Sequence, residues 1–111
     1  MKKLLSIVVL TIMFVVVALQ PSAFAANIAS GKGVFQGNCA ACHIGGKNNI
    51  NPAKTLRKSD LEKYGMFEAD EIIYQVTNGK NAMPAFGRRL KPQQIENVAA
   101  YVMAQAEGGW K

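Results

Sequence analysis

Histidine and cysteine are scarce in this sequence of 111 residues, which holds one histidine and two cysteines. That set is too small for a zinc site built from four cysteine and histidine ligands. The chain also has no internal repeat, low-complexity tract, interdomain linker or convincing strand alternation. These absences indicate one small domain for which no β-sheet is predicted.

The first 25 residues have the composition of an export signal. Lysines at 2–3 precede an almost wholly apolar run over 4–19, and Ala23-Phe24-Ala25 follows with small residues at both ends. This order predicts a cleavable signal peptide over 1–25, with cleavage after Ala25. The alternative is a membrane anchor, but the apolar run is shorter than a bilayer-spanning helix usually needs. Residues 26–111 would then form the mature domain, which is not expected to span a membrane.

The charge of the mature domain is modest. Residues 26–111 carry 11 basic and 7 acidic side chains, a net charge of +4. The basic residues are scattered and no aromatic platform accompanies them, so we expect no nucleic-acid binding. A positive balance can steer an acidic partner, although a merely solvated surface explains most of these charges equally well.

Helical patterns account for all the regular structure that we predict. Asn27 is placed as an N-cap, Ser59 and Glu62 have the spacing of a capping box, and Pro92 suits a first helical position. The longer segments repeat apolar side chains at helical spacing. The four predicted helices span 27–37, 59–64, 69–78 and 92–107. The fold class is therefore predicted to be all-α.

Both cysteines and the histidine fall in one motif, Cys39-Ala40-Ala41-Cys42-His43. C-x-x-C-H is typical of c-type haem attachment. Two thiols at this spacing can reach the two vinyl groups on one porphyrin edge, and the adjacent imidazole then falls beneath the iron. A haem would also supply apolar core to a small domain and hold the long loops over 44–58 and 80–91. We therefore predict one covalently bound haem c, with Cys39 and Cys42 as attachment points and His43 as an iron ligand.

Three other interpretations of the motif stay open. An exported protein can form a disulfide between Cys39 and Cys42. A thioredoxin-like dithiol has the same cysteine spacing, but its βαβ context is missing here. A zinc site would need a fourth ligand that the remaining chain does not offer.

The second axial ligand is predicted to be a methionine sulfur. The candidates in the mature domain are Met66, Met83 and Met103. Met103 falls within a predicted helix, and Met66 lies in a short turn. Met83 lies far from His43 in a loop stiffened by Pro84, so it can close over the opposite haem face. We predict His43 and Met83 as the axial pair, which favours ferrous iron more than two nitrogen ligands do.

Three segments resemble one known family. The stretches Phe35–His43, Ile73–Gly79 and Asn81–Phe86, in this order and spacing, are similar to cytochrome c6. The resemblance covers essentially all of residues 26–111. It implies a class I cytochrome c fold of about four helices around one haem, with the first and last helices crossing. Gly31, Phe35 and Tyr101 match the residues that pack at that crossing.

The resemblance also implies roles for individual residues. Gln75 matches a glutamine near the haem that helps to set its potential, and Lys54 matches a basic position near a haem propionate. Arg89 matches an arginine implicated in docking to photosystem I. The alternative is that Arg88 and Arg89 are simply a pair of solvated surface residues. The predicted contact patch around the haem edge includes Ala85 and Phe86. Phe86 replaces the tryptophan that many members carry, so a role for that indole does not transfer.

The function implied by the resemblance is one-electron transfer without catalysis. The expected donor is cytochrome f of the cytochrome b6f complex, the acceptor is photosystem I, and the carrier is expected to be a monomer in the thylakoid lumen. Without a stroma-targeting segment ahead of the signal, a cyanobacterial or plastid gene is expected. The alternatives are a bacterial carrier that donates to a terminal oxidase, or a haem enzyme or gas-binding protein with an open sixth site.

Overall fold

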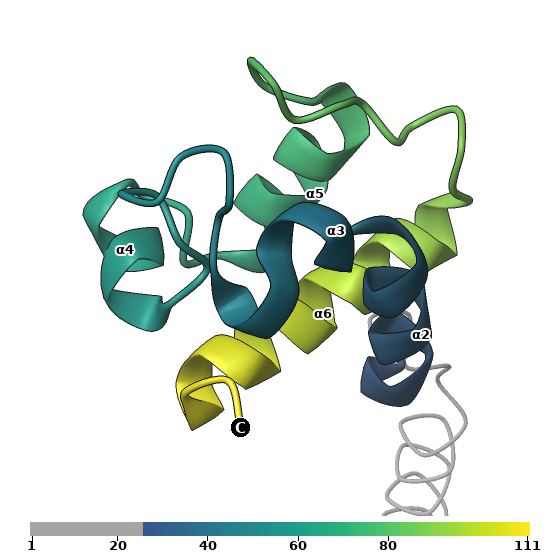
Figure 1. The fold of residues 1–111 in the computed structure, drawn as a ribbon. Coiled ribbons are helices and arrows are strands. Elements are labelled where there is room, and N and C mark those ends of the chain that lie inside the picture. The colour runs from purple at the N-terminus through teal and green to yellow at the C-terminus, as the bar shows by residue number, and fades with distance from the viewer. Residues whose placement is uncertain (1–25) are drawn as a thin grey trace, which may run out of the picture.

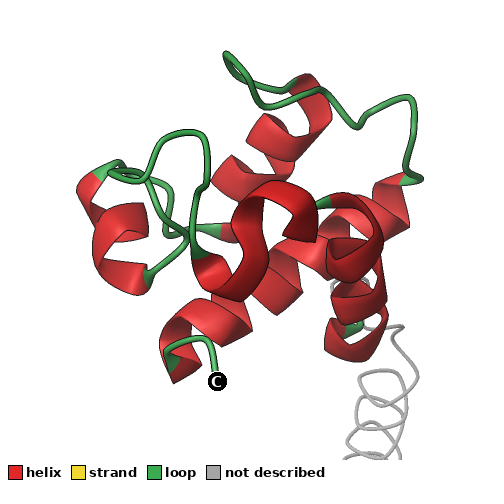
Figure 2. Cartoon of the chain, in the orientation of Figure 1, coloured by secondary structure: helices red, strands yellow, loops and turns green. Residues whose placement is uncertain are grey.

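The computed structural model describes residues 26–111 as an assembly of helices and loops (Figures 1 and 2). In this range the chain forms no β-strand, and one isolated antiparallel bridge joins Lys80 and Met83. The elements are α2 (Ile28–Asn38), α3 (Ala40–His43), the 3₁₀ turn η1 (Ile44–Gly46), α4 (Lys58–Lys63), α5 (Ala69–Asn78) and α6 (Pro92–Gly108). The all-α prediction is confirmed, and α3 and η1 are additions to it. The predicted signal peptide lies outside the described residues.

Helix α2 begins as its sequence predicts. The Asn27 side chain accepts a hydrogen bond from the Ser30 backbone N–H at 3.0 Å, which satisfies one of the free donors of the first turn. The face that α2 buries is narrow and consists of Gly31 and Phe35.

That narrow face packs across α6 near its middle (Figure 1). A Cβ on Gly31 would lie 2.0 Å from the backbone oxygen of Asn97 and 2.9 Å from Cβ of Tyr101. Only glycine therefore allows the two backbones to approach so closely. The Phe35 and Tyr101 rings lie beside this point, with centroids 5.3 Å apart. The expected crossing of the first and last helices is confirmed.

Helix α4 begins differently from the prediction. It starts at Lys58, so Ser59 lies inside its first turn and no side chain caps it. The predicted capping box is therefore wrong. Asp60 instead accepts hydrogen bonds from both the backbone N–H and the hydroxyl of Thr55. These bonds hold the pKa of the Asp60 carboxyl below its usual value, and they fix the entry of the chain into α4.

The other two helices follow the predicted boundaries closely. Helix α5 spans Ala69–Asn78 as predicted, and α6 ends at Gly108, one residue beyond its predicted end. Both turn apolar side chains inward, and α5 packs against α6. The buried hydrophobic core consists of Phe35, Leu61, Ile72, Val76, Phe86, Ile95, Val98, Ala99, Val102 and Ala106.

The long loop between α5 and α6 is held by the chain itself. Backbone N–H groups of Phe86 and Gly87 donate to the carbonyl oxygens of Val76 and Thr77 at 2.8 and 3.1 Å. The first part of the loop is therefore pinned back onto the end of α5, as the green segment in Figure 1 shows. These backbone bonds therefore hold part of a loop that the sequence predicted to be held by a haem.

Candidate haem site

The cysteine–histidine motif lies where α2 gives way to α3. Cys39 is the residue after α2, and Cys42 and His43 lie on the single turn of α3. The backbone oxygen of Cys39 accepts bonds from the N–H groups of Cys42 and His43 at 3.2 and 2.9 Å. This turn brings the two sulfurs and the imidazole onto one short segment.

The surroundings of the two thiols bear on two of the three alternatives, the reactive dithiol and the zinc site. Cys39 and Cys42 are both half-buried and are not joined to each other. Burial raises the pKa of the Cys39 thiol to about 11, whereas a reactive dithiol needs a lowered pKa. Within residues 26–111, no three His, Cys, Asp or Glu side chains gather where they could hold a metal ion. The raised thiol pKa is not that of a thioredoxin-like dithiol, and no cluster for a zinc site forms among the described residues.

The imidazole of His43 is oriented by a backbone carbonyl. Nδ1 of His43 lies 2.9 Å from the carbonyl oxygen of Lys47. Because a carbonyl can only accept, Nδ1 carries the proton in this bond, and Nε2 keeps a lone pair for a metal. Such a second bond typically fixes the tautomer and ring orientation of a ligating histidine.

The Met83 sulfur is placed by both its backbone and a side-chain partner. Reciprocal backbone bonds of 2.9 and 3.0 Å join Met83 to Lys80. Gly79 precedes them with φ of 73°, and a Cβ there would lie 2.7 Å from the Met83 carbonyl oxygen. The Gln75 side-chain amide donates to the Met83 sulfur at 3.5 Å. Gln75 and Met83 are thus brought together, as expected if both belong to one site.

The other two methionines also pack against the core. Met66 and Met103 are half-buried beside it. Met103 lies inside α6, and Met66 follows α4, where its N–H donates to the Leu61 carbonyl oxygen at 2.7 Å. Each therefore has an ordinary packing role.

These donors fit a c-type haem. Two unjoined thiols, one imidazole with a free Nε2 and one oriented thioether are the groups that such a haem needs for attachment and axial ligation.

Lys54 lies on the surface loop between η1 and α4. Its Nζ is 5.0 Å from the centroid of the Tyr64 ring, a cation–π contact, and its carbonyl accepts from the Asn48 side chain at 2.9 Å. No contact in the structure links Lys54 to Met83 or His43.

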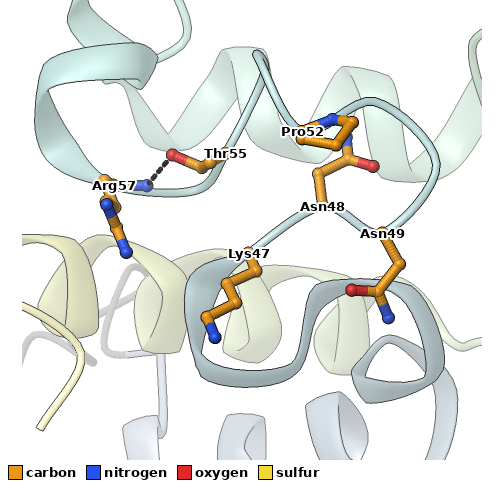
Figure 3. A pocket seen from close by; sticks show the side chains of 6 residues that line it. All are labelled: Lys47, Asn48, Asn49, Pro52, Thr55 and Arg57. Atoms are coloured by element: carbon orange, nitrogen blue, oxygen red, sulfur yellow. Dashed lines mark hydrogen bonds between the residues drawn. The ribbon is translucent and has the colours of Figure 1, made fainter.

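A cavity of about 340 Å³ opens within the same loop (Figure 3). Figure 3 shows the side chains of Lys47 and Arg57 extending in the same direction. The backbone N–H of Arg57 donates to the Thr55 hydroxyl oxygen at 3.2 Å. The remaining lining residues are Asn48, Asn49 and Pro52. No local sequence pattern predicts this cavity, because its walls meet only after the loop has folded.

The predicted docking residues do not all lie on the surface. Ala85, Arg88 and Arg89 are exposed. Phe86 is only 6% exposed and belongs to the hydrophobic core. The expectation that Phe86 forms part of a contact surface is therefore wrong, because the backbone bond from Phe86 to Val76 draws the ring inward. The Arg89 guanidinium lies over that ring at 5.7 Å.

One residue near the motif had no predicted role. Trp110, the only tryptophan, packs on Gly46 just beyond the motif and donates to the Leu56 carbonyl at 2.9 Å. That it is the single tryptophan was the only feature of the sequence that could have indicated a role for this residue. Its position depends on a left-handed turn after α6 that no pattern shows.

Comparison with known proteins places these features in a family. The sequence model described as "Cytochrome C oxidase, cbb3-type, subunit III" matches residues 26–102. Cytochrome c6 of Rippkaea orientalis is 60% identical over 111 residues, and that of a Nostoc strain is 57% identical, each over the full length of both chains. The crystal structure of cytochrome c6 from the diatom Phaeodactylum tricornutum is 56% identical, with a TM-score of 0.74. It covers 76% of this chain and 99% of the diatom protein.

None of the helices between residues 26 and 111 combines the length and hydropathy needed to cross a membrane.

The matches extend over the motif, the Met83 loop and both crossing helices, so the likeness includes the whole described domain. The chain belongs to the cytochrome c6 family, whose members are electron-transfer proteins with a covalently bound haem c.

Proposed function

We propose that this cytochrome accepts single electrons from cytochrome f of the cytochrome b6f complex and delivers them to photosystem I in the thylakoid lumen. Membership of the cytochrome c6 family and the cyanobacterial origin of several relatives support this role. The proposal includes a signal peptide over residues 1–25 that directs residues 26–111 to that compartment.

The proposed site uses four side chains of this chain. Cys39 and Cys42 hold the haem through thioether bonds, and His43 Nε2 and Met83 Sδ bind its iron. The bound haem supplies an iron that changes between the ferric and ferrous states, one electron at a time. Cys39 and Cys42 would tether the haem where α2 gives way to α3, and His43 and Met83 would hold its iron.

The observation that carries this proposal is that each proposed axial ligand already has an orienting partner. The Lys47 carbonyl holds the His43 ring at 2.9 Å, and the Gln75 amide reaches the Met83 sulfur at 3.5 Å. Ligands held in place by the surrounding protein need to move little when the charge on the metal changes. Small rearrangement is what a carrier between two large complexes requires.

Three exposed residues would serve the approach to partners and to the haem. Ala85 and Arg89 lie on the loop that carries Met83, and we assign the docking surface to them. The net charge of +4 on residues 26–111 would favour the encounter with an acidic partner. Lys54 is assigned to the neighbourhood of a haem propionate.

The test of this function is transient kinetics with purified holoprotein. The reduced protein should re-reduce flash-oxidised photosystem I, and the oxidised protein should accept electrons from reduced cytochrome f, both with second-order kinetics. Rapid transfer to a terminal oxidase together with slow transfer to photosystem I would replace this role with the respiratory one. Ready carbon monoxide binding by the reduced protein at neutral pH would contradict Met83 ligation and favour a gas-binding role.

A further inference from the structure

The chain after α6 folds back sharply onto the body of the protein. Gly109 adopts a left-handed conformation with φ of 76°, and Trp110 follows with φ of 61°. A bulky residue rarely adopts a positive φ, because its Cβ crowds the backbone. The Trp110 N–H donates to the Gln105 carbonyl at 2.8 Å, which closes the turn. The contacts of the Trp110 side chain must therefore offset a local conformational cost.

The indole fills the space between three separate segments. Its centroid lies 5.4 Å from that of Phe35 on α2 and 6.1 Å from that of Tyr101 on α6. The ring also lies against Gly46, where a Cβ would come within 2.5 Å of three indole atoms. Gly46 itself has φ of 78°, so any side chain there would be strained as well as obstructed.

Hydrogen bonds join the indole to the loop that follows the haem motif. Trp110 Nε1 donates to the Leu56 carbonyl at 2.9 Å, and the Leu56 N–H donates to the Gly46 carbonyl at 2.8 Å. Trp110 therefore contacts both ends of the segment from Gly46 to Leu56 and ties them together. We call these contacts with Gly46 and Leu56 the Trp110 clamp.

The clamp lies one residue from the carbonyl that orients His43. Lys47 directly follows Gly46, its N–H donates to Ile44 at 3.2 Å, and its carbonyl oxygen is the partner of His43 Nδ1 at 2.9 Å. Any movement of Gly46 would displace that carbonyl relative to the imidazole. We propose that Trp110 is a positioning residue for His43, acting through Gly46 and the Lys47 carbonyl. This inference rests on His43 being the iron ligand proposed above.

Loss of the clamp has two measurable consequences. A carbonyl that accepts from Nδ1 makes the imidazole a stronger electron donor to the iron, which favours the ferric state. Weakening this bond should therefore raise the reduction potential. It should also expose the Nδ1 proton of His43 to solvent, so that its hydrogen exchange becomes faster.

The experiment compares Trp110→Ala, Trp110→Phe and the neighbouring control Lys111→Ala, all as holoproteins. Hydrogen exchange is followed by NMR at the His43 ring N–H, at the Leu56 N–H and at the N–H of Val98, a buried residue of α6 that reports global opening. The reduction potential is measured in parallel. Trp110→Ala should speed exchange at His43 and Leu56 at least tenfold more than at Val98 and raise the potential.

Trp110→Phe keeps an aromatic ring on Gly46 but lacks the Nε1 donor. It should speed exchange at Leu56 with a smaller effect at His43, and it provides the test if Trp110→Ala does not fold. Lys111→Ala should match the wild type. Equal acceleration at His43, Leu56 and Val98, with an unchanged potential, would reduce Trp110 to general packing and overturn the proposal. A wild-type protein whose His43 ring shows no haem-shifted resonance would instead contradict the proposed ligand set.

Discussion

The side-chain amide of Gln75 donates a hydrogen bond to the sulfur of Met83 at 3.5 Å. Gln75 is half-buried on α5, and Met83 lies in the loop that follows this helix. A donor directed at a thioether competes for the electron density that the sulfur would give to iron. Ferric iron depends on that density more than ferrous iron does, so the bond should raise the reduction potential.

Replacing Gln75 with leucine, which has a similar size and no donor, should therefore lower the potential. A difference of about 1 kcal/mol in hydrogen-bond strength corresponds to about 40 mV in a one-electron couple, so a fall of tens of millivolts is expected. Redox titration measures it. Tyr74→Phe, at an exposed neighbour on α5, is the control and should leave the potential unchanged. A potential that stays constant or rises in Gln75→Leu would argue against the bond to Met83.

A pair of glycines on α2 tests the close crossing with α6. Gly31→Ala places a Cβ 2.0 Å from the Asn97 carbonyl oxygen, whereas a Cβ at Gly33 meets nothing within 4 Å. Overpacking should make Gly31→Ala less stable by about 3 kcal/mol or more, and Gly33→Ala should gain ~0.5–1 kcal/mol from higher helix propensity. Chemical denaturation measures both. Equal effects would mean that the helices do not meet at Gly31.

The hydrogen-bonded carboxylate of Asp60 should make the folded domain less stable in acid. Two hydrogen bonds from Thr55 hold its pKa below the ordinary value of 3.8, so the unfolded chain takes up this proton first. The contribution is complete above that value and is lost as the pH falls through the lowered pKa. Asp60→Asn should remove this part of the pH dependence, while Glu62→Gln on the same helix serves as a charge control. Unfolding curves from neutral pH down to pH about 2 measure it; identical acid profiles for wild type and Asp60→Asn would contradict the prediction.

The charge of Arg89 should speed the encounter of this protein with photosystem I. It is exposed on the Met83 loop, so Arg89→Gln should slow the second-order rate at low salt by about three- to tenfold and leave the reduction potential unchanged. The difference should shrink as salt screens the charge. Lys63→Gln, the same kind of charge loss at an exposed position on α4, is the matched control. Equal slowing in both variants would point to net charge rather than to docking at Arg89.

Local signals in the sequence predicted most of the helices. Asn27 caps α2 through a bond within its own first turn, and Asn78-Gly79 ends α5 where predicted, because these features depend on neighbouring residues alone. The capping box at Ser59 failed for the opposite reason. Asp60 is held by Thr55, and that loop geometry moves the start of α4 to Lys58.

Parts of the site depend on tertiary structure and could not be predicted from local pattern. Phe86 follows a loop motif that suggested exposure, yet its bond to Val76 turns the ring into the core. Gly46 and Trp110 are far apart in the sequence, and their contact needs both positive φ angles and the α2–α6 crossing. By contrast, the cysteine–histidine motif consists of neighbouring residues. Haem attachment could therefore be predicted from the sequence alone.

Covalent attachment of a haem to Cys39 and Cys42 is measured most directly by mass spectrometry of the exported protein, intact and after proteolysis, together with its absorption spectrum in both redox states. We expect one haem added to the mass of residues 26–111, carried on the peptide that contains Cys39 and Cys42, and a ferrous spectrum that carbon monoxide does not change. A colourless protein whose mass fits a Cys39–Cys42 disulfide would contradict it.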